Sequence, residues 1–382
     1  MELPGDIQAW SVTRHETIRE LAGDRRVSRD PRKHWPSLDD MPEDWPLNVW
    51  VRVVSAFTSY GEEHRRLRKL ISTAFTPRRT EALRPMVQDL VDGLIRDLEK
   101  VPPGEAVDLR SRFAYMIPTE VICGLFGVPQ HMRPETRRCI DAALHTGSSP
   151  EQAKKDFDDL LACMAALVAV KRAEPGPDMT SDLIAARDGE MKLDEQQLIS
   201  TLLLMIGAGS ETAVNLIAKA THALLTHPDQ RKLLDTGTVA WDDVIEETLR
   251  TEGPIMHMPL RFAVEDIDLG EGVVIRKGEP IILGFGAAGR DPALHGADAD
   301  VFDATRPDKD HLAFGFGAHY CLGAALARME ADIALRALFG TFPDLRLAVD
   351  EEQLRPQPSF IANGHEELPV LLRPAVPAAP AA

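Results

Sequence analysis

One cysteine in this sequence lies where a thiolate can bind a metal cofactor. Cys321 belongs to the string FGFGAHYCLGAALAR, residues 314–328, between a glycine-rich turn and the start of an apolar helix. Gly315 and Gly317 allow a tight turn whose amide groups point at the sulfur, and Gly323 leaves room for a flat ligand. The positive end of the helix dipole is expected to lower the pKa of this thiol from about 8.5 toward neutral. A free cysteine is more often a small buried apolar side chain, but the glycines, the flanking histidine and the helix together favour a metal-bound thiolate.

An acid and an alcohol stand next to each other within a long apolar segment. They are Glu211 and Thr212, in the string AGSET that begins at Ala208. A threonine hydroxyl can donate to the carbonyl oxygen four residues earlier, here that of Ala208, and can bend or open a helix. Small residues at this point let a ligand approach the backbone. The alternative is close packing between helices with Glu211 at the surface.

Two further pairs are spaced so that their side chains share one helix face. Glu247 and Arg250 lie at positions i and i+3, where they can pair or together hold a third group. His64 and Arg68 lie one helical turn apart, which suits two donors that hold an anion. An exposed charged face is the simpler interpretation of either pair alone.

The elements that must position these residues are mainly helical. Apolar residues recur at helical spacing, which predicts helices near residues 87–98, 111–126, 134–146, 150–172, 195–226, 229–235 and 241–252. The longest of these runs through the middle of the domain, since it rises ~1.5 Å per residue. Short strands are expected at residues 9–13, 260–263, 273–275 and 280–283. They predict a small sheet assembled from distant parts of the chain.

Composition excludes several classes of protein. The 382 residues carry a net charge of −17, which argues against nucleic acid as a partner. No stretch approaches the ~20 apolar residues that cross a bilayer, and no secretory signal is apparent. We therefore expect a cytoplasmic monomer without a membrane partner. The four cysteines lack the spacing of a zinc site or a disulfide scaffold.

Three of these motifs together resemble the cytochrome P450 family of haem-thiolate monooxygenases: the cysteine string, the Glu247 and Arg250 pair, and the AGSET string. Their order and spacing are those of the soluble bacterial, ferredoxin-dependent type, and the resemblance spans nearly the whole chain. Further similar strings occur at residues 64–79, 290–292 and 302–306. Gly289 is a departure, because asparagine is common at that position in the family.

The resemblance implies the fold class. It is mainly α, the cytochrome P450 fold, with a large helical domain around a long central helix, a small β-rich region, and haem buried between them. Residues 1–373 are expected to form a single domain with β-rich portions near 1–60 and 255–300. The Pro/Ala tail, residues 374–382, is expected to be disordered.

The resemblance also assigns roles around haem b. Cys321 corresponds to the axial ligand of the iron, Phe314 packs near the sulfur, and Gly315 and Gly323 belong to the loop around it. Glu211 and Thr212 correspond to the residues that deliver protons to bound dioxygen, and Ala208 and Gly209 open the helix groove for that dioxygen. Four residues match positions that bind the haem propionates: His64, Arg68, Arg261 and His319. Glu247 and Arg250 match the structural pair that locks the helical core.

The implied activity is hydroxylation or epoxidation of a bulky hydrophobic substrate, such as a steroid, a macrolide or another secondary metabolite. Electrons from NAD(P)H would arrive through ferredoxin reductase and an acidic ferredoxin that docks on basic residues such as Arg65, Arg66, Lys69 and Arg79. The expected substrate pocket comprises Val53, Phe57, Leu203, Ile255, Met256, His257, Phe360 and Ile361. Oxidative coupling of aromatic rings is the alternative activity, and a non-catalytic haem-binding protein is the alternative class.

Overall fold

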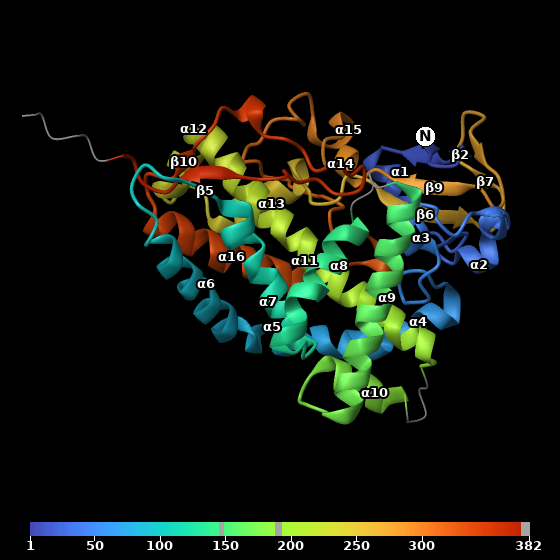
Figure 1. Cartoon of the computed structure of the whole chain (residues 1–382). Helices are drawn as coiled ribbons and strands as arrows, with labels where there is room; N and C mark the ends of the chain where they lie inside the picture. The colour runs from blue at the N-terminus through green and yellow to red at the C-terminus, as the bar shows by residue number, and fades with distance from the viewer. Residues whose placement is uncertain (145–148, 188–192, 376–382) are drawn as a thin grey trace, which may run out of the picture.

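The computed structural model describes residues 1–144, 149–187 and 193–375 (Figure 1). Most of the Pro/Ala tail for which disorder is expected lies outside these residues. Helices make up most of the described chain, as expected from the apolar periodicity. Two small sheets lie on opposite sides of the helical region in Figure 1.

Eleven longer or site-forming helices build the helical region of the described chain. They are α4 (Gly61–Ser72), α5 (Pro77–Ala82), α6 (Arg84–Leu98), α7 (Met116–Leu125), α8 (Arg133–Leu144), α9 (Pro150–Ala173), α10 (Met179–Arg187), α11 (Glu195–Thr226), α12 (Pro228–Asp235), α13 (Trp241–Thr251) and α16 (Ala324–Thr341). A π-helical segment, Arg110–Ala114, precedes α7. Shorter helices lie nearer the sheets: α1 (His15–Gly23), α2 (Pro31–His34), α3 (Asn48–Val51), α14 (Phe285–Ala288) and α15 (Pro292–His295).

Helix α11 is the central element, as the sequence predicts. A capping box fixes its start, in which Asp194 accepts from the Gln197 amide at 2.7 Å and the Gln197 side chain accepts from the Asp194 amide. Among the described helices it alone is long and apolar enough to cross a bilayer, but 67% of its most apolar window is buried inside the protein. It packs against α7, α9, α13 and α16. The apolar surface of α11 is therefore that of a core helix.

Two apolar cores meet along α11. The first packs its C-terminal half, from Val214 onward, against α6, α7, α13 and α16. The second packs its N-terminal half, up to Ile206, against α4, α7, α8 and α9. The segment between Ile206 and Val214 belongs to neither core, and it contains both Glu211 and Thr212. The polar pair thus lies where the two cores separate.

The larger sheet confirms the prediction of a sheet built from distant segments. Its order is β3 (Trp10–Val12), β9 (Pro280–Leu283), β6 (Met258–Ala263) and β4 (Val27–Ser28). Strands β3 and β9 are parallel, with Trp10 opposite Ile281, and the other pairs are antiparallel.

Of the other strands, only β8 (Val274–Ile275) was expected, within residues 273–275. A second sheet has the order β10 (Arg346–Leu347), β11 (Pro369–Leu371) and β5 (Ala106–Asp108), outside the expected β-rich portions. Two hairpins join β1 (Glu2–Leu3) to β2 (Ile7–Gln8) and β7 (Ile267–Asp268) to β8 (Val274–Ile275). Strands of two or three residues are too short to show an alternating pattern.

Candidate active site

The loop before α16 presents Cys321 at its end. The Cys321 amide donates to the Phe314 carbonyl at 2.9 Å, which closes the turn. Gly315 and Gly317 have φ values of 72° and 70°, a region that favours glycine. A side chain at Gly317 would also lie 2.9 Å from a backbone oxygen of α1. The glycines therefore do what the sequence suggests, which is to permit a tight turn.

The surroundings of Cys321 are open on one side. A Cβ built on Gly323 would meet only the Cys321 sulfur within 4 Å, at 3.9 Å. Cys321 is exposed, whereas the other three cysteines are buried. This loop therefore leaves space beside the sulfur of an exposed residue, as a flat ligand requires.

The pKa of the Cys321 thiol differs in direction from the sequence-based expectation. Burial of the sulfur among protein atoms raises the pKa above its usual value, although hydrogen bonds from the Gly323 and Ala324 amides and the charges of Arg68 and Arg328 act in the opposite direction. The helix N-terminus alone therefore does not produce a thiolate here. A bound metal cation would, because coordination deprotonates a thiol.

Four basic residues from three parts of the chain gather at this loop. The rings of His64 and His319 lie 4.2 Å apart between centroids. Arg68 donates to the Tyr320 carbonyl at 2.5 Å. Arg261, on β6, is 2% exposed. The structure therefore brings together all four residues that the sequence analysis assigned to propionate binding.

The electrostatics of this basic cluster are those of an anion site. Burial, followed by the charges of Arg68 and Arg29, lowers the pKa of His64 to about 4. Burial likewise lowers the pKa of His319 and that of Arg261, the latter to about 10. Several buried nitrogens in the described part of the chain have no hydrogen-bond partner, and three of them belong to this cluster: His64 Nε2, Arg261 Nε and Arg29 Nε. Buried donors and charges without partners are costly, so this cluster suits a ligand with negatively charged oxygens.

Arg29 is a member of this cluster that the sequence analysis missed. Its Nη2 donates to the Pro259 carbonyl at 2.7 Å, and its guanidinium lies 3.4 Å from the centroid of the Phe57 ring. It directly follows the two-residue strand β4, which has no recognisable periodicity. No sequence signal distinguishes Arg29 from the other arginines near the N-terminus.

Glu247 and Arg250 form a fully buried pair on α13. The guanidinium donates to both carboxylate oxygens, at 2.8 and 2.7 Å. It also donates to the carbonyl oxygens of Gly289, Ala299 and Val301 at 2.7 to 3.0 Å. The pair therefore joins α13 to two loops that precede the cysteine. The alternative interpretation, an exposed charged pair at the surface, is wrong.

Gly289, the departure from the family pattern, fits this arrangement. A Cβ at Gly289 would lie 1.9 Å from the Arg250 carbonyl oxygen. In this chain the loop after α14 therefore passes directly against the end of α13, where only glycine has room.

Glu211 and Thr212 are held by different contacts. Thr212 Oγ1 donates to the Ala208 carbonyl at 2.9 Å, as the sequence predicts. Glu211 is 7% exposed, so the alternative interpretation, which placed Glu211 at the surface, is wrong. Its Oε1 accepts from Arg110 and from Gln357, each at 2.6 Å. The sequence analysis missed both partners, which are more than 100 residues away along the chain.

The glycines of α11 have different neighbours. A Cβ on Gly209 would lie 2.7 Å from Cδ1 of Ile122 on α7, whereas a Cβ on Gly207 would meet nothing within 4 Å. Gly209 therefore serves close packing between helices, and its expected role in opening the helix groove stays a prediction. Gly207, in contrast, faces open space.

An apolar cavity, partly open to solvent, adjoins this part of α11. It is lined by Val49, Trp50, Val53, Ser55, Phe57, Ile140, Leu160, Leu203, Leu204, Gly207 and Ala208. Three residues of the expected pocket, Val53, Phe57 and Leu203, are among these. The cavity therefore reaches from the segment before α4 to the middle of α11.

The other expected pocket residues lie outside the lining of this cavity. They are Ile255, Met256, His257, Phe360 and Ile361. His257 Nδ1 lies 2.7 Å from the Phe360 carbonyl, and the Met256 amide donates to the Ile361 carbonyl at 2.8 Å. Ile255 pairs with Ala362 in an isolated bridge. These residues join two chain segments, and their contact with a substrate stays a prediction.

Comparison with known proteins shows the family. The sequence model described as Cytochrome P450 matches residues 241–362. A 2-hydroxy-5-methyl-1-naphthoate 7-hydroxylase from Streptomyces carzinostaticus is 43% identical over 375 residues, which cover 98% of this chain and 91% of the relative. The chain belongs to the cytochrome P450 family. A 6-deoxyerythronolide B hydroxylase from Saccharopolyspora erythraea is 37% identical over 95% of this P450 and 90% of the relative.

Solved structures show that the P450 fold extends over the whole chain. CYP154A1 from Streptomyces coelicolor A3(2) is 50% identical and superimposes with a TM-score of 0.94. The alignment covers 97% of this chain and 93% of that one. CYP154C4 from Streptomyces sp. W2061 is 42% identical, with a TM-score of 0.93 over 98% and 91%. The predicted fold class is therefore confirmed.

The cofactor of this P450 is haem b, which members of the family bind through a cysteine thiolate. The residues present fit this group. Cys321 is an exposed residue with a free thiol, Gly323 leaves the adjacent space open, and the basic cluster has buried donors without acceptors. The two haem propionates supply the anionic oxygens that those donors lack.

Proposed function

We propose that this cytochrome P450 monooxygenase hydroxylates or epoxidises a bulky hydrophobic substrate such as a steroid, a macrolide or another secondary metabolite. The observation that carries the proposal is the apolar cavity. Gly207 and Ala208 line one side of it, on the same helix as Glu211 and Thr212. Apolar walls with a few polar groups are typical of sites for such molecules.

The names of the relatives support this substrate class. Besides the naphthoate and 6-deoxyerythronolide B hydroxylases, they include a vitamin D(3) 25-hydroxylase from Pseudonocardia autotrophica, 36% identical over 97% of this chain. A testosterone-bound CYP154C4 structure is 41% identical, with a TM-score of 0.93. The molecules in these names include a bicyclic naphthoate, a macrolide and a steroid, each built on a hydrocarbon skeleton.

In this proposal Cys321 holds the haem iron, and the basic cluster of Arg29, His64, Arg68, Arg261 and His319 holds the propionates. When bound, haem supplies a redox-active iron at which dioxygen is reduced and one of its oxygen atoms is inserted into the substrate. The protein's task is to exclude water, orient the substrate in the cavity and deliver protons at the right place.

Proton delivery is assigned to Glu211 and Thr212. Arg110 and Gln357 both bind Oε1 of Glu211, which leaves Oε2 to carry a proton. The Thr212 hydroxyl donates to the Ala208 carbonyl, so its oxygen can accept a hydrogen bond from an incoming group. Together they form an acid and an alcohol at one point of the helix.

The electron donor proposed is an acidic ferredoxin, reduced by NAD(P)H through ferredoxin reductase. Arg65 and Lys69 on α4 and Arg79 on α5 are exposed, whereas Arg66 is partly buried and donates to Gln197. Arg68 of the same helix bonds to Tyr320, the residue before Cys321. A negatively charged partner on this face would therefore approach the cysteine side of the site.

The test of the oxygenase mechanism is Thr212→Ala in the haem-loaded enzyme with a surrogate ferredoxin system. We expect NAD(P)H consumption to continue while product per NAD(P)H falls by about tenfold or more and hydrogen peroxide accumulates. Ser210→Ala is the matched control, because Ser210 also donates to a carbonyl of its own helix, that of Ile206 at 3.0 Å. Unchanged coupling in Thr212→Ala would overturn the assignment.

Oxidative coupling is the second candidate. One solved relative, CxnD, is described as forming a C–S bond in chuangxinmycin biosynthesis, and it is 34% identical with a TM-score of 0.87. Turnover under ¹⁸O₂ separates the two reactions. Hydroxylation or epoxidation places the label in the product, whereas coupling leaves the product unlabelled.

A further inference from the structure

A short chain of side-chain hydrogen bonds leads to Glu211 from the next turn of α11. Asn215 lies four residues after Glu211, on the same helix face, and it is fully buried. Its Nδ2 donates to Oε1 of Gln357 at 3.1 Å, and Nε2 of Gln357 donates to Oε1 of Glu211 at 2.6 Å. Two amides therefore stand in series behind the carboxylate to which proton delivery is assigned.

The direction of this chain is fixed by its chemistry. An ionised carboxylate only accepts hydrogen bonds, so the Gln357 amide must turn its nitrogen toward Glu211 and its oxygen away. Asn215 meets that oxygen with its own nitrogen. If the Gln357 amide were turned over, its oxygen would face the carboxylate at the 2.6 Å that now separates Nε2 from Oε1. Asn215 thus favours the one orientation of Gln357 that can donate to Glu211.

This orientation leaves one buried atom without a partner. Oδ1 of Asn215 accepts no hydrogen bond in the part of the chain that the structure describes. Turning both amides over would pair this oxygen with the Gln357 nitrogen, but Glu211 would then face an oxygen. Buried polar groups are rarely left unpaired. The chain therefore keeps the hydrogen bond to Glu211 at the expense of one at Asn215.

The loop that carries Gln357 holds its amide against α11. The Gln357 backbone amide donates to the Gly364 carbonyl at 2.9 Å, and Pro356 pairs with His365 in an isolated bridge. A Cβ on Gly364 would clash with Oδ1 of Asn215 and with Oε1 of Gln357. Glycine at this position therefore leaves the space that the two side-chain amides occupy.

We infer that Gln357 and Asn215 are positioning residues, which orient the carboxyl group of Glu211 for proton delivery. Arg110, from the π-helical segment, donates to the same Oε1 at 2.6 Å, so two donors hold that oxygen. With Oε1 held, the carboxyl group keeps one orientation, and Oε2 is the oxygen that exchanges the proton. Gln357 and Asn215 act through Glu211, and neither takes up the proton itself.

This inference rests on the proposed role of Glu211. In its test, the haem-loaded enzyme is supplied with a surrogate ferredoxin system and with testosterone as the probe. Gln357→Leu and Asn215→Leu should each lower product per NAD(P)H by about threefold or more, while the Kd of testosterone stays unchanged. The double variant should lose no more than either single variant, because both residues act through one hydrogen bond to Glu211. Losses that multiply would overturn the inference.

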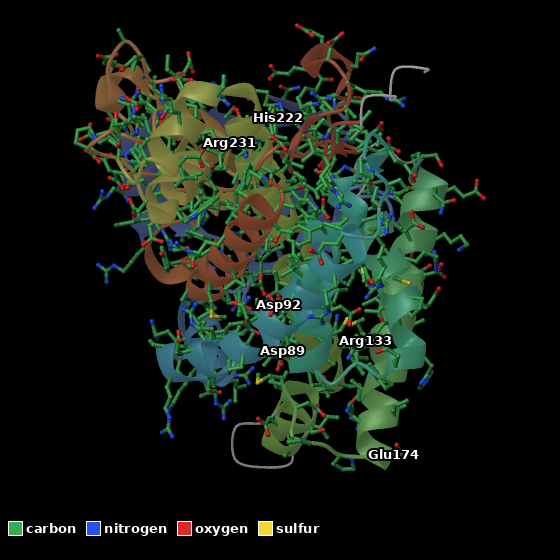
Figure 2. The ribbon with its side chains drawn as sticks, turned by 90° about the vertical axis from the view of Figure 1, so that its left-hand side faces the viewer. Asp89, Asp92, Arg133, Glu174, His222 and Arg231 are labelled. Carbon is green, nitrogen blue, oxygen red and sulfur yellow. The ribbon has the colours of Figure 1, made fainter. Side chains whose placement is uncertain are left out.

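Gln88→Leu is the matched control. Gln88 is exposed on α6, and its Nε2 donates to Oδ1 of Asp92 at 2.9 Å (Asp92 is labelled in Figure 2). Equal coupling in Gln357→Leu and in this control would overturn the inference. If Glu211→Gln also leaves coupling unchanged, the proposed proton delivery itself fails; if Glu211→Gln alone uncouples, the failure is limited to the two amides.

A second readout needs no turnover. In protein with ¹⁵N-labelled glutamine side chains, the NMR signal that is missing from Gln357→Leu should exchange with solvent about tenfold or more slowly than that of Gln88. Its chemical shift should change in Glu211→Gln and in Asn215→Leu. A signal that neither variant changes would contradict the proposed orientation.

Two outcomes need a further arm of the experiment. If Asn215→Leu does not fold, Gly364→Ala replaces it, because the added Cβ displaces both amides without altering them. Testosterone left unoxidised by the wild type would contradict a steroid as the substrate. The amide signal of Gln357 then decides the inference by itself.

Discussion

At the scale of single residues, the site depends on charged groups that pair with one another in partly buried positions. Glu246, next to the buried Glu247, accepts from Arg328 at 2.5 and 2.8 Å and lies 3.1 Å from His311 Nε2. The Arg328 guanidinium in turn lies 4.5 Å from the centroid of the Phe314 ring. This second network therefore fixes the turn that precedes Cys321 to the side of α13.

The pH dependence of stability follows from this network. Burial alone would raise the pKa of Glu246, but the hydrogen bonds from Arg328 and His311 outweigh it and lower the pKa to about 2 from its ordinary value of 4.5. A lowered pKa in the folded state stabilises the fold above pH 4.5, and this contribution is lost as the pH falls toward 2.

Glu246→Gln is therefore expected to lower the free energy of unfolding at pH 7 by about 2 kcal/mol. The difference from the wild type should shrink steadily below pH 4.5. Urea unfolding of the haem-loaded proteins across this range measures it, with Glu16→Gln on the exposed face of α1 as the control. A difference that does not change with pH would show that Glu246 acts through packing alone.

At the scale of elements, α11 positions the polar pair of the site, because the middle of this helix belongs to neither apolar core. Gly207 faces open space beside the cavity, while Gly209 packs against Ile122 of α7. The two glycines lie on one helix, two residues apart, and differ only in what a side chain would meet. They make a matched pair for a substitution experiment.

Gly207→Ala should stabilise the protein by up to about 1 kcal/mol, because alanine has the higher helix propensity and nothing obstructs its Cβ. Gly209→Ala gains the same propensity but must displace Ile122, and overpacking costs about 1–3 kcal/mol. Thermal unfolding of the two variants should therefore rank Gly207→Ala above Gly209→Ala. The reverse order would contradict the packing described for α11.

The elements also show what the sequence could predict. Helix α11, with its bounds and its Thr212 to Ala208 hydrogen bond, followed from periodicity and local chemistry. The partners of Glu211 did not, because Arg110 and Gln357 are brought to it by tertiary packing. For the same reason His64 and Arg68, which share a helix face, could be predicted. Arg29 could not, because it reaches the basic cluster from the position after a two-residue strand.

At the scale of the whole molecule, an acidic protein surrounds a basic interior cluster. The net charge is −17, yet Arg29, Arg68 and Arg261 converge with two histidines beside the Cys321 loop. Buried positive charge without partners costs stability. The propionates of haem b relieve that cost, and the sulfur of Cys321 completes the binding of the group.

The central claim is that Cys321 ligates the haem iron, and X-ray absorption at the iron edge tests it most directly. The purified haem-loaded protein should show a sulfur scatterer in the first shell of the iron. Cys321→His should lose that scatterer, whereas Cys163→Ser, at a buried cysteine of α9, should keep it. An iron–sulfur signal that persists in Cys321→His would contradict the account.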